Sequence, residues 1–199
     1  MESSIRPVTL DDVIGLDRYE ALRERIRGEV IALKRHRRLS VGDEITFVFE
    51  NHATVFFQIQ EMIRAERITD LDAVRDELRV YNALLPAPGQ LSATMLIEIT
   101  EEKDIAQRLL RLRGIDEAVR LELGTEFVIG AEFEAGRSKE DKLSAVQYVR
   151  FSFPPAARTA FMADRVPARL VIDHQSYQAA AAIDGELRAS LCVDLRGTA

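Results

Sequence analysis

Four side chains in the first third of the chain have the chemistry of metal ligands. Glu50 and His52 lie two residues apart, and Glu61 and Glu66 follow in a segment with helical periodicity. A histidine nitrogen combined with carboxylates is a ligand set that suits iron or manganese. No His-x-x-x-His or Cys-x-x-Cys pattern accompanies them. The sequence therefore names His52, Glu50, Glu61 and Glu66 as candidate ligands of a transition metal, with a solvated turn histidine as the alternative.

Glu66 is the most informative of these carboxylates. On a helical wheel over 58–67 it falls in the same arc as Ile59, Met62 and Ile63, so an apolar face would draw it inward. A carboxylate in that position needs a cation, a metal or hydrogen-bond donors, or else it holds a proton. The alternative is that Glu66 lies at the edge of the face and pairs with an arginine.

The same helix also offers a polar surface. Gln58, Arg64 and Arg67 project from it, and Asn82 lies beside apolar residues further along, so these four residues form a candidate binding surface. The basic run 34–38 could bind phosphate or nucleic acid. A solvated helix end is the favoured reading of that run, because cations stabilise the C-terminus of a helix.

Several chemistries leave no signature. The chain has no Gly-x-Gly-x-x-Gly motif, and the polar loop over 136–142 lacks the glycine spacing and the Gly-Lys-Ser/Thr ending of a phosphate loop. Its serines lack the glycines of a nucleophile elbow. Nothing indicates a nucleotide cofactor, and the motifs alone do not decide whether the protein is an enzyme.

Composition indicates a globular protein. The 199 residues are 47% hydrophobic and 30% charged, with a net charge of −6 and a pI near 5.2. The acidic balance and the absence of tryptophan make nucleic-acid binding an unfavoured function. Cys192 is the one cysteine, which suits a reducing compartment. The N-terminus shows no apolar signal core and no run is long enough to span a membrane, so we expect a soluble, cytoplasmic protein.

The apolar spacing predicts several helices. Thr9 and Asp12 have the spacing of a capping box, which predicts a helix start there. The remaining helices are expected over 17–38, 58–67, 69–85, 101–113, 156–162 and 184–195.

Alternating residues and short turns predict strands. Asn51 and His52 are expected to form a turn between two antiparallel strands, 45–50 and 54–57. Short turns imply antiparallel pairing, so the expected fold class is α+β: a largely antiparallel sheet of about seven strands packed with N-terminal and connecting helices. We expect one domain over 1–199, with a weak seam at 86–90. The further strands are expected over 91–99, 119–123, 126–133, 144–153, 168–172 and 177–183.

Five short segments carry a resemblance to a known family: Phe49-Glu50-Asn51, Gln58-Ile59-Gln60-Glu61-Met62, Tyr81-Asn82-Ala83-Leu84-Leu85-Pro86, Leu91-Ser92-Ala93-Thr94 and Ser144-Ala145-Val146-Gln147-Tyr148. They resemble the bacterial family designated domain of unknown function 3501, over almost the whole chain. The resemblance brings no established activity or catalytic residues. It implies proximity to redox or peroxide metabolism, because members of the family are often encoded near rubrerythrin-like proteins and iron–sulphur oxidoreductases.

Three hypotheses follow. The first is a non-catalytic accessory or small-ligand-binding protein that works beside a redox system, with rubrerythrin-like proteins or iron–sulphur oxidoreductases as partners by family association. The second is a metal-dependent enzyme with carboxylate and histidine ligands. The third is a nucleic-acid-binding or regulatory module that uses residues 34–38. An exposed edge strand, or the apolar side of the first long helix, could pair two copies into a homo-oligomer.

Overall fold

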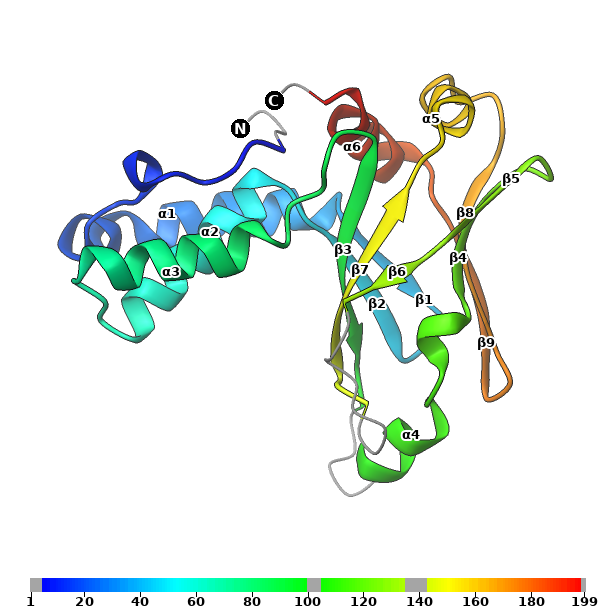
Figure 1. Ribbon diagram of the computed structural model, residues 1–199, viewed down its shortest axis with the longest axis horizontal. Coiled ribbons are helices and arrows are strands. Elements are labelled where there is room, and N and C mark those ends of the chain that lie inside the picture. Colours follow the sequence, from blue (N-terminus) through cyan, green and yellow to red (C-terminus); the bar gives the residue numbers. More distant parts are fainter. Residues whose placement is uncertain (1–4, 100–104, 135–142, 198–199) are drawn as a thin grey trace.

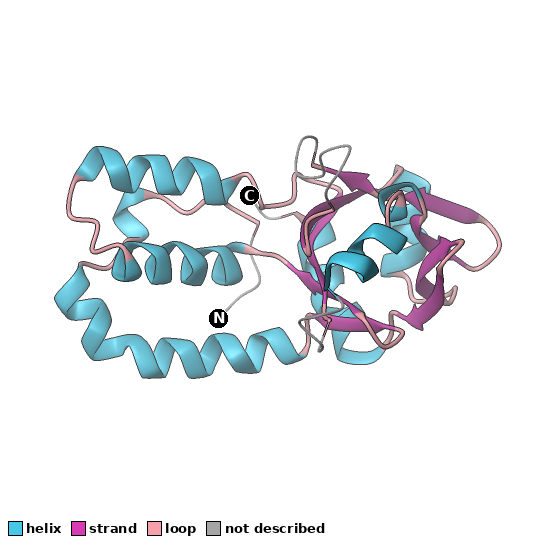
Figure 2. Ribbon diagram, turned by 90° about the horizontal axis from the view of Figure 1, so that it is seen from below, coloured by secondary structure: helices cyan, strands magenta, loops and turns pink. Residues whose placement is uncertain are grey.

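The computed structural model describes residues 5–99, 105–134 and 143–197. An arm of helices projects to one side of a lobe built from two antiparallel sheets (Figures 1 and 2). The described residues form nine strands and six α-helices, so the α+β class is confirmed, with two sheets in place of the single sheet of about seven strands. The start of the predicted helix over 101–113 and the polar loop over 136–142 lie outside the described residues.

The arm comes from two parts of the first 82 residues, before Arg38 and after Phe49. Its helices are η1 (Leu10–Asp12, a 3-10 turn), α1 (Leu16–Arg35), α2 (His52–Ala65) and α3 (Leu71–Asn82). Val55, Ile59 and Ile63 of α2 are buried against Val74 and Leu78 of α3. This apolar packing between helices holds the arm together, because no single amphipathic helix buries its stripe alone.

The two sheets enclose the larger core. The first has the order β1-β2-β3-β7-β6 and the second β5-β4-β8-β9, and each strand is antiparallel to its neighbours. Phe47, Met95 and Phe151 are fully buried between them. The strands are β1 (Arg38–Val41), β2 (Ile45–Phe49), β3 (Gln90–Ile97), β4 (Val119–Leu123), β5 (Phe127–Gly130), β6 (Glu132–Phe133), β7 (Val146–Ser152), β8 (Ala168–His174) and β9 (Tyr177–Ala182).

Short helices connect and cover the sheets. Figure 1 shows α5 and α6 at one end of the lobe and α4 at the other. Leu191 and Leu195 of α6 are fully buried in the sheet core. The bounds are α4 (Ile105–Arg111), η3 (Ile115–Glu117, a 3-10 turn), α5 (Pro155–Met162) and α6 (Gly185–Arg196).

The predicted hairpin over 45–57 is wrong in its second half, because α2 starts there. Asn51 is the N-cap: its side chain accepts a hydrogen bond from Thr54 N at 3.1 Å, and Thr54 Oγ1 accepts from Asn51 N at 3.0 Å. This reciprocal cap satisfies N–H groups that a helix start leaves free. The β-branched and aromatic residues of the run 54–57 favour a strand by propensity. The N-cap and the burial of Val55 among the helices stabilise a helix instead.

The first long helix ends earlier than predicted. It stops at Arg35, and β1 begins at Arg38. Arg37 is fully buried, and its Nε donates to the carbonyl oxygen of Phe49 at 2.8 Å. The basic run 34–38 is therefore divided between a helix end, a buried arginine and a strand, and does not form one cationic face.

The predicted strand over 126–133 is shared by the two sheets. Phe127–Gly130 pairs with β4, whereas Glu132 and Phe133 pair with Arg150 and Val149 of β7. The chain therefore passes from one sheet to the other within a single extended segment, which closes the lobe on that side (Figure 1).

Candidate ligand-binding site

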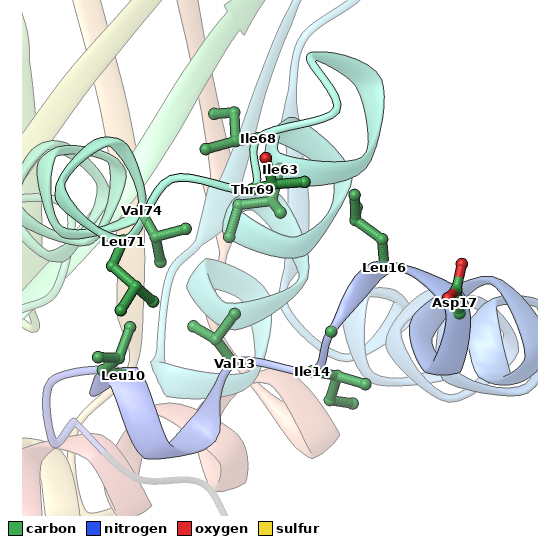
Figure 3. A pocket seen from close by; sticks show the side chains of 11 residues that line it. Leu10, Val13, Ile14, Leu16, Asp17, Ile63, Ile68, Thr69, Leu71 and Val74 are labelled. Atoms are coloured by element: carbon green, nitrogen blue, oxygen red, sulfur yellow. The ribbon is translucent and has the colours of Figure 1, made fainter.

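The tip of the arm is hollowed by an apolar pocket of about 510 Å³. It lies where η1, the start of α1, the end of α2 and the start of α3 meet. Figure 3 shows Leu10, Val13, Leu71 and Val74 gathered on one side of it. Thr69 and Asp17 are the polar side chains in the lining. The other lining residues are Leu10, Val13, Ile14, Gly15, Leu16, Ile63, Ile68, Leu71 and Val74.

The wall between α2 and α3 is shaped by two helix ends. Arg67, directly after the C-cap of α2, has a φ of +51°, and Ile68 N donates to Ile63 O at 2.9 Å. This is a Schellman-type ending, in which glycine is the usual residue at the left-handed position. Asp70 then caps α3 by accepting from Asp72 N at 3.0 Å and Ala73 N at 2.9 Å. Ile68 and Thr69 are thereby held at the pocket.

Two side-chain amides fix the opposite wall. Gln60, fully buried, accepts from Ile14 N at 2.7 Å and donates to Ile14 O at 3.1 Å. Asn82 accepts from Val8 N and donates to Val8 O, both at 2.8 Å. Each side-chain amide thus binds both the N–H and the carbonyl group of one residue, the way a paired residue on a neighbouring β-strand does. Asn82, predicted as part of a binding surface, instead holds the N-terminal segment against the arm.

The segment between these clamps has its own support. Arg6 and Asp12 form an exposed ion pair at 2.7 Å, and the Arg6 guanidinium holds the pKa of the Asp12 carboxyl well below its usual range. The Asp12 carboxylate also accepts a hydrogen bond from Thr9 N at 2.8 Å, which confirms the predicted capping box. Leu10 of η1 and Val13 directly after it are therefore presented to the pocket by a locally fixed turn.

A second hollow of about 430 Å³ adjoins the apolar pocket and shares Leu16 and Asp17 with it. Arg64 and Arg67, both predicted as binding residues, line it together with Glu20. No ion pair within 4 Å joins these arginines to Asp17 or Glu20 among the described residues. The structure thus brings Arg64 and Arg67 to the mouth of an apolar pocket.

Glu61 serves the packing of α1 on α2. Arg23 donates to it twice, at 2.9 and 2.8 Å, and the hydroxyl of Tyr19 donates at 2.9 Å. The Arg23 hydrogen bonds lower the pKa of Glu61 to about 2, against the opposing effect of burial. Burial and the neighbouring Glu61 raise the pKa of Tyr19 above its usual range. Glu61 is therefore an anion that joins two helices.

Glu50 is buried at the base of the arm, where β2 runs into α2. It accepts from Thr94 Oγ1 at 2.6 Å, from Gln58 Nε2 at 3.2 Å and from Thr54 Oγ1. All three donors are neutral, and no cationic side chain among the described residues forms an ion pair with this carboxylate. Gln58, predicted as a surface binding residue, is thus half-buried and donates a hydrogen bond to Glu50.

The four predicted metal ligands do not converge. His52 Nδ1 lies 3.0 Å from Arg6 O, and its ring stacks on Phe56. Glu66 is exposed at the C-cap of α2, because the helix ends before its side chain can turn inward. Within the described ranges no group of three or more His, Cys, Asp or Glu side chains is arranged to hold a metal ion.

The other reactive side chains are also committed to structure. Cys192 is buried, and burial raises the pKa of its thiol. His174 Nε2 lies 2.9 Å from Arg113 O, while its Nδ1 accepts from Ser176 N at 3.2 Å, an arrangement of a neutral ring. A polar hollow of about 320 Å³ beside α4 holds Arg108 paired with Glu44, together with Arg111 and Tyr177.

Sequence reasoning missed the apolar pocket itself. Its lining comes from three short stretches, 10–17, 63–69 and 71–74, and each alone looks like ordinary core. The structure adds a sign that the sequence did not carry: Leu71, at the start of an amphipathic helix, is 56% exposed. A large apolar residue that remains exposed at a helix start is a feature that merits attention when it borders other apolar residues.

Comparisons with known proteins agree with the fold. The sequence profile of a family described as "Protein of unknown function (DUF3501)" matches residues 7–195. The crystal structure of a "novel protein of unknown function" from Burkholderia pseudomallei K96243 is similar, with a TM-score of 0.89 and 33% identity. The similarity covers 96% of this chain and 100% of that one. No curated protein matches. No helix in the described part of the chain is long and apolar enough to cross a membrane.

Proposed function

Because the chain belongs to the DUF3501 family, whose description assigns no activity, we propose a function from its own geometry: a non-catalytic protein that binds a small apolar molecule at the tip of its helical arm. The observation that carries the proposal is the pocket between η1, α2 and α3. Its volume of about 510 Å³ lies within the 300–1,000 Å³ typical of ligand pockets.

The lining supports binding over catalysis. Nine of its eleven residues are aliphatic or glycine, and its polar side chains are Thr69 and Asp17. Neither has a histidine or lysine beside it in the lining that could act as a general base. An apolar wall with few polar groups favours a ligand bound through its hydrocarbon part.

The framework around the pocket supports a site that exists before ligand arrives. Gln60 and Asn82 hold the N-terminal segment through four hydrogen bonds, and Asp70 caps α3. A pocket whose walls are already fixed requires little further ordering on binding, which favours affinity.

The test uses a neutral fluorescent probe, N-phenyl-1-naphthylamine. We expect saturable binding of one probe per chain. Val13→Phe would fill the pocket from η1 and weaken binding at least tenfold. Leu71→Asp, at an exposed position on the rim, would weaken it without loss of core packing.

Val128→Phe is the matched control, because Val128 is 67% exposed on β5 of the sheet lobe. Its probe affinity should equal that of the wild type. Circular dichroism and the Tm of each variant report whether the fold is retained. Absence of saturable binding by the wild type, or equal binding by a folded Val13→Phe variant, would overturn the proposal.

We also propose an accessory role beside a redox system, which only the family resemblance suggests. Its partners would be rubrerythrin-like proteins or iron–sulphur oxidoreductases. The test is an anaerobic pull-down with the wild type and with Arg64→Glu, which reverses a charge on the arm. Recovery of the same redox protein by the wild type and its loss in the variant is the expected result, and recovery of none contradicts it.

A further inference from the structure

We infer that the ligand of the arm pocket is a monoanionic amphiphile, a medium-chain carboxylate, whose head group is bound by Arg64 and Arg67. This inference rests on the proposed function and names the chemistry of its ligand. It starts from the two adjoining hollows, one lined almost wholly by aliphatic residues and the other by charged side chains, with Leu16 and Asp17 in both. A molecule with an apolar tail and a charged head matches that division.

Arg64 has hydrogen-bonding capacity that the fold leaves unused. Its Nε is buried and forms no hydrogen bond among the described residues. The nearest carboxylate oxygen, Glu61 Oε1, lies 3.4 Å away and is already bound by Tyr19 and by Arg23. The Nε is closed to solvent and faces Glu61, so a ligand would meet the terminal nitrogens of Arg64, which form no hydrogen bond among the described residues and belong to a side chain that is 33% exposed.

Arg67 occupies a backbone position at which its side chain brings no conformational advantage. Its φ of +51° is in the left-handed region, which glycine adopts without steric cost and which follows the ends of many helices. An exposed arginine at this position, without an ion pair among the described residues, gains nothing for the helix ending. A guanidinium that binds an acceptor explains why the strain is tolerated.

The acidic residues of the hollow set the charge of the ligand. Asp17 and Glu20 are exposed on α1 and line the same hollow as the two arginines. Two acids and two arginines sum to zero, so a single carboxylate meets two guanidinium groups without strong repulsion. A phosphate monoester carries close to two charges at neutral pH and would be repelled more strongly by the same acids. The two acids thus oppose a second negative charge on the ligand, and for this reason we infer a head group with a single charge.

The experiment measures displacement of N-phenyl-1-naphthylamine by three ten-carbon ligands below their micelle concentrations: decanoate, 1-decanol and decyl phosphate. We expect decanoate to bind at least tenfold more tightly than 1-decanol and more tightly than decyl phosphate. Charge-assisted hydrogen bonds from arginine to carboxylate are of a strength that can supply such a factor.

Two variants assign the preference to the arginines. Arg67→Gly and Arg64→Met should each reduce the preference for decanoate over 1-decanol towards one, while probe and 1-decanol still bind. Arg67→Gly should not lower the Tm, because glycine suits the left-handed position. The control is Arg35→Met, an exposed arginine at the other end of α1, which should keep the full preference.

The outcomes separate this inference from the proposed function. Equal binding of decanoate and 1-decanol by the wild type, with probe binding intact, overturns the carboxylate assignment and leaves the apolar site. Tighter binding of decyl phosphate than of decanoate overturns the monoanion assignment. A preference that survives in both arginine variants removes Arg64 and Arg67 from the head-group site. If the probe itself does not bind, the proposed function fails first.

Discussion

Arg37 and Asp194, 157 residues apart in the chain, form a buried ion pair in which Arg37 Nη2 donates to Asp194 Oδ2 across 2.5 Å. Arg37 is fully buried and Asp194 is 1% exposed. Three further N–H groups of Arg37 donate to Ser190 Oγ at 2.8 Å and to the carbonyl oxygens of Phe49 and Glu50. The end of α1, the end of β2 and α6 therefore meet on one guanidinium group.

Replacement of Arg37 by methionine should destabilise the protein strongly. The substitution takes the Arg37 cation away from the buried Asp194 carboxylate, and removal of one partner of a buried ion pair costs about 3–5 kcal/mol in comparable sites. Urea denaturation measures the change in the free energy of unfolding. Arg35→Met, at an exposed position two residues away, should stay within about 0.5 kcal/mol of the wild type. A loss of less than 1 kcal/mol in Arg37→Met would contradict this role.

The same pair bears on the prediction of one domain over 1–199. The arm and the sheet lobe have separate core clusters, yet Arg37 fixes the end of the arm to the last helix of the lobe. We therefore expect a single cooperative unfolding transition, with tyrosine fluorescence and far-UV circular dichroism giving the same midpoint. In Arg37→Met we expect the two midpoints to separate. Two transitions in the wild type would show that the arm unfolds independently.

Glu61 should make the arm sensitive to acid. Its pKa is lowered from 4.5 to about 2 by the hydrogen bonds from Arg23, so the unfolded chain binds a proton at a higher pH than the folded one. The stabilisation is complete above about pH 4.5 and is lost as the pH falls towards 2. Its size is of the order of 1–3 kcal/mol. Glu61→Gln should lose much of the pH dependence in this window, as measured by denaturation at several pH values.

A matched comparison is available on the same helix. Glu66 is exposed at the C-cap of α2, so Glu66→Gln should leave both the stability and its pH dependence as in the wild type. If Glu66→Gln changed the acid transition as much as Glu61→Gln, the Arg23–Glu61 contact would not be its cause.

Gly42 and Tyr177 form a close contact between the β1–β2 turn and β9. Gly42 has a φ of +70°, and a Cβ there would lie 2.4 Å from Tyr177 Oη. That hydroxyl donates to Val41 O at 2.6 Å and accepts from Glu44 N at 3.2 Å, so it cannot move away freely. Gly42→Ala should therefore cost about 2–4 kcal/mol, from backbone strain and from the lost contact.

A double variant checks this explanation. Tyr177→Phe removes the hydroxyl and its two hydrogen bonds, and Gly42→Ala should then be less costly than in the wild type, since the nearest atom is gone. The difference between the two costs is the coupling energy, measured by urea denaturation. Strict additivity would show that backbone strain alone accounts for the effect.

The sequence predicted most elements because local signals agreed with the fold. The apolar stripe of α1, the Asp70 start of α3 and the alternation in β3 all lie where periodicity indicated. Asn51 shows where local reasoning failed: an Asn before an aromatic and β-branched run suits a turn or an N-cap equally. The Asn51–Thr54 cap decides between them only once Val55 packs against α3.

The candidate site depended even more on distant contacts. Arg64 and Arg67 were recognisable as a polar pair on a helix, but the apolar pocket beside them forms only when α3 and the N-terminal turn close over the end of α2. In the sequence, Gln58 and Asn82 cannot be distinguished from polar residues on the surface. Their partners, Glu50 and Val8, are brought to them by tertiary packing that no local pattern reports.

Glu50 provides the last prediction, because a buried carboxylate with neutral partners separates the cost of charge from the cost of lost hydrogen bonds. It is 3% exposed and accepts from Thr54, Gln58 and Thr94. Glu50→Ala would leave these three donors without an acceptor in a buried site and should cost about 2–4 kcal/mol. Glu50→Gln keeps an acceptor oxygen and removes the charge, and threonine hydroxyls can rotate to accept from its amide. Its stability should therefore lie within about 1 kcal/mol of the wild type in urea denaturation. If Glu50→Gln were as unstable as Glu50→Ala, the negative charge itself would be what the surrounding hydroxyls and amide require.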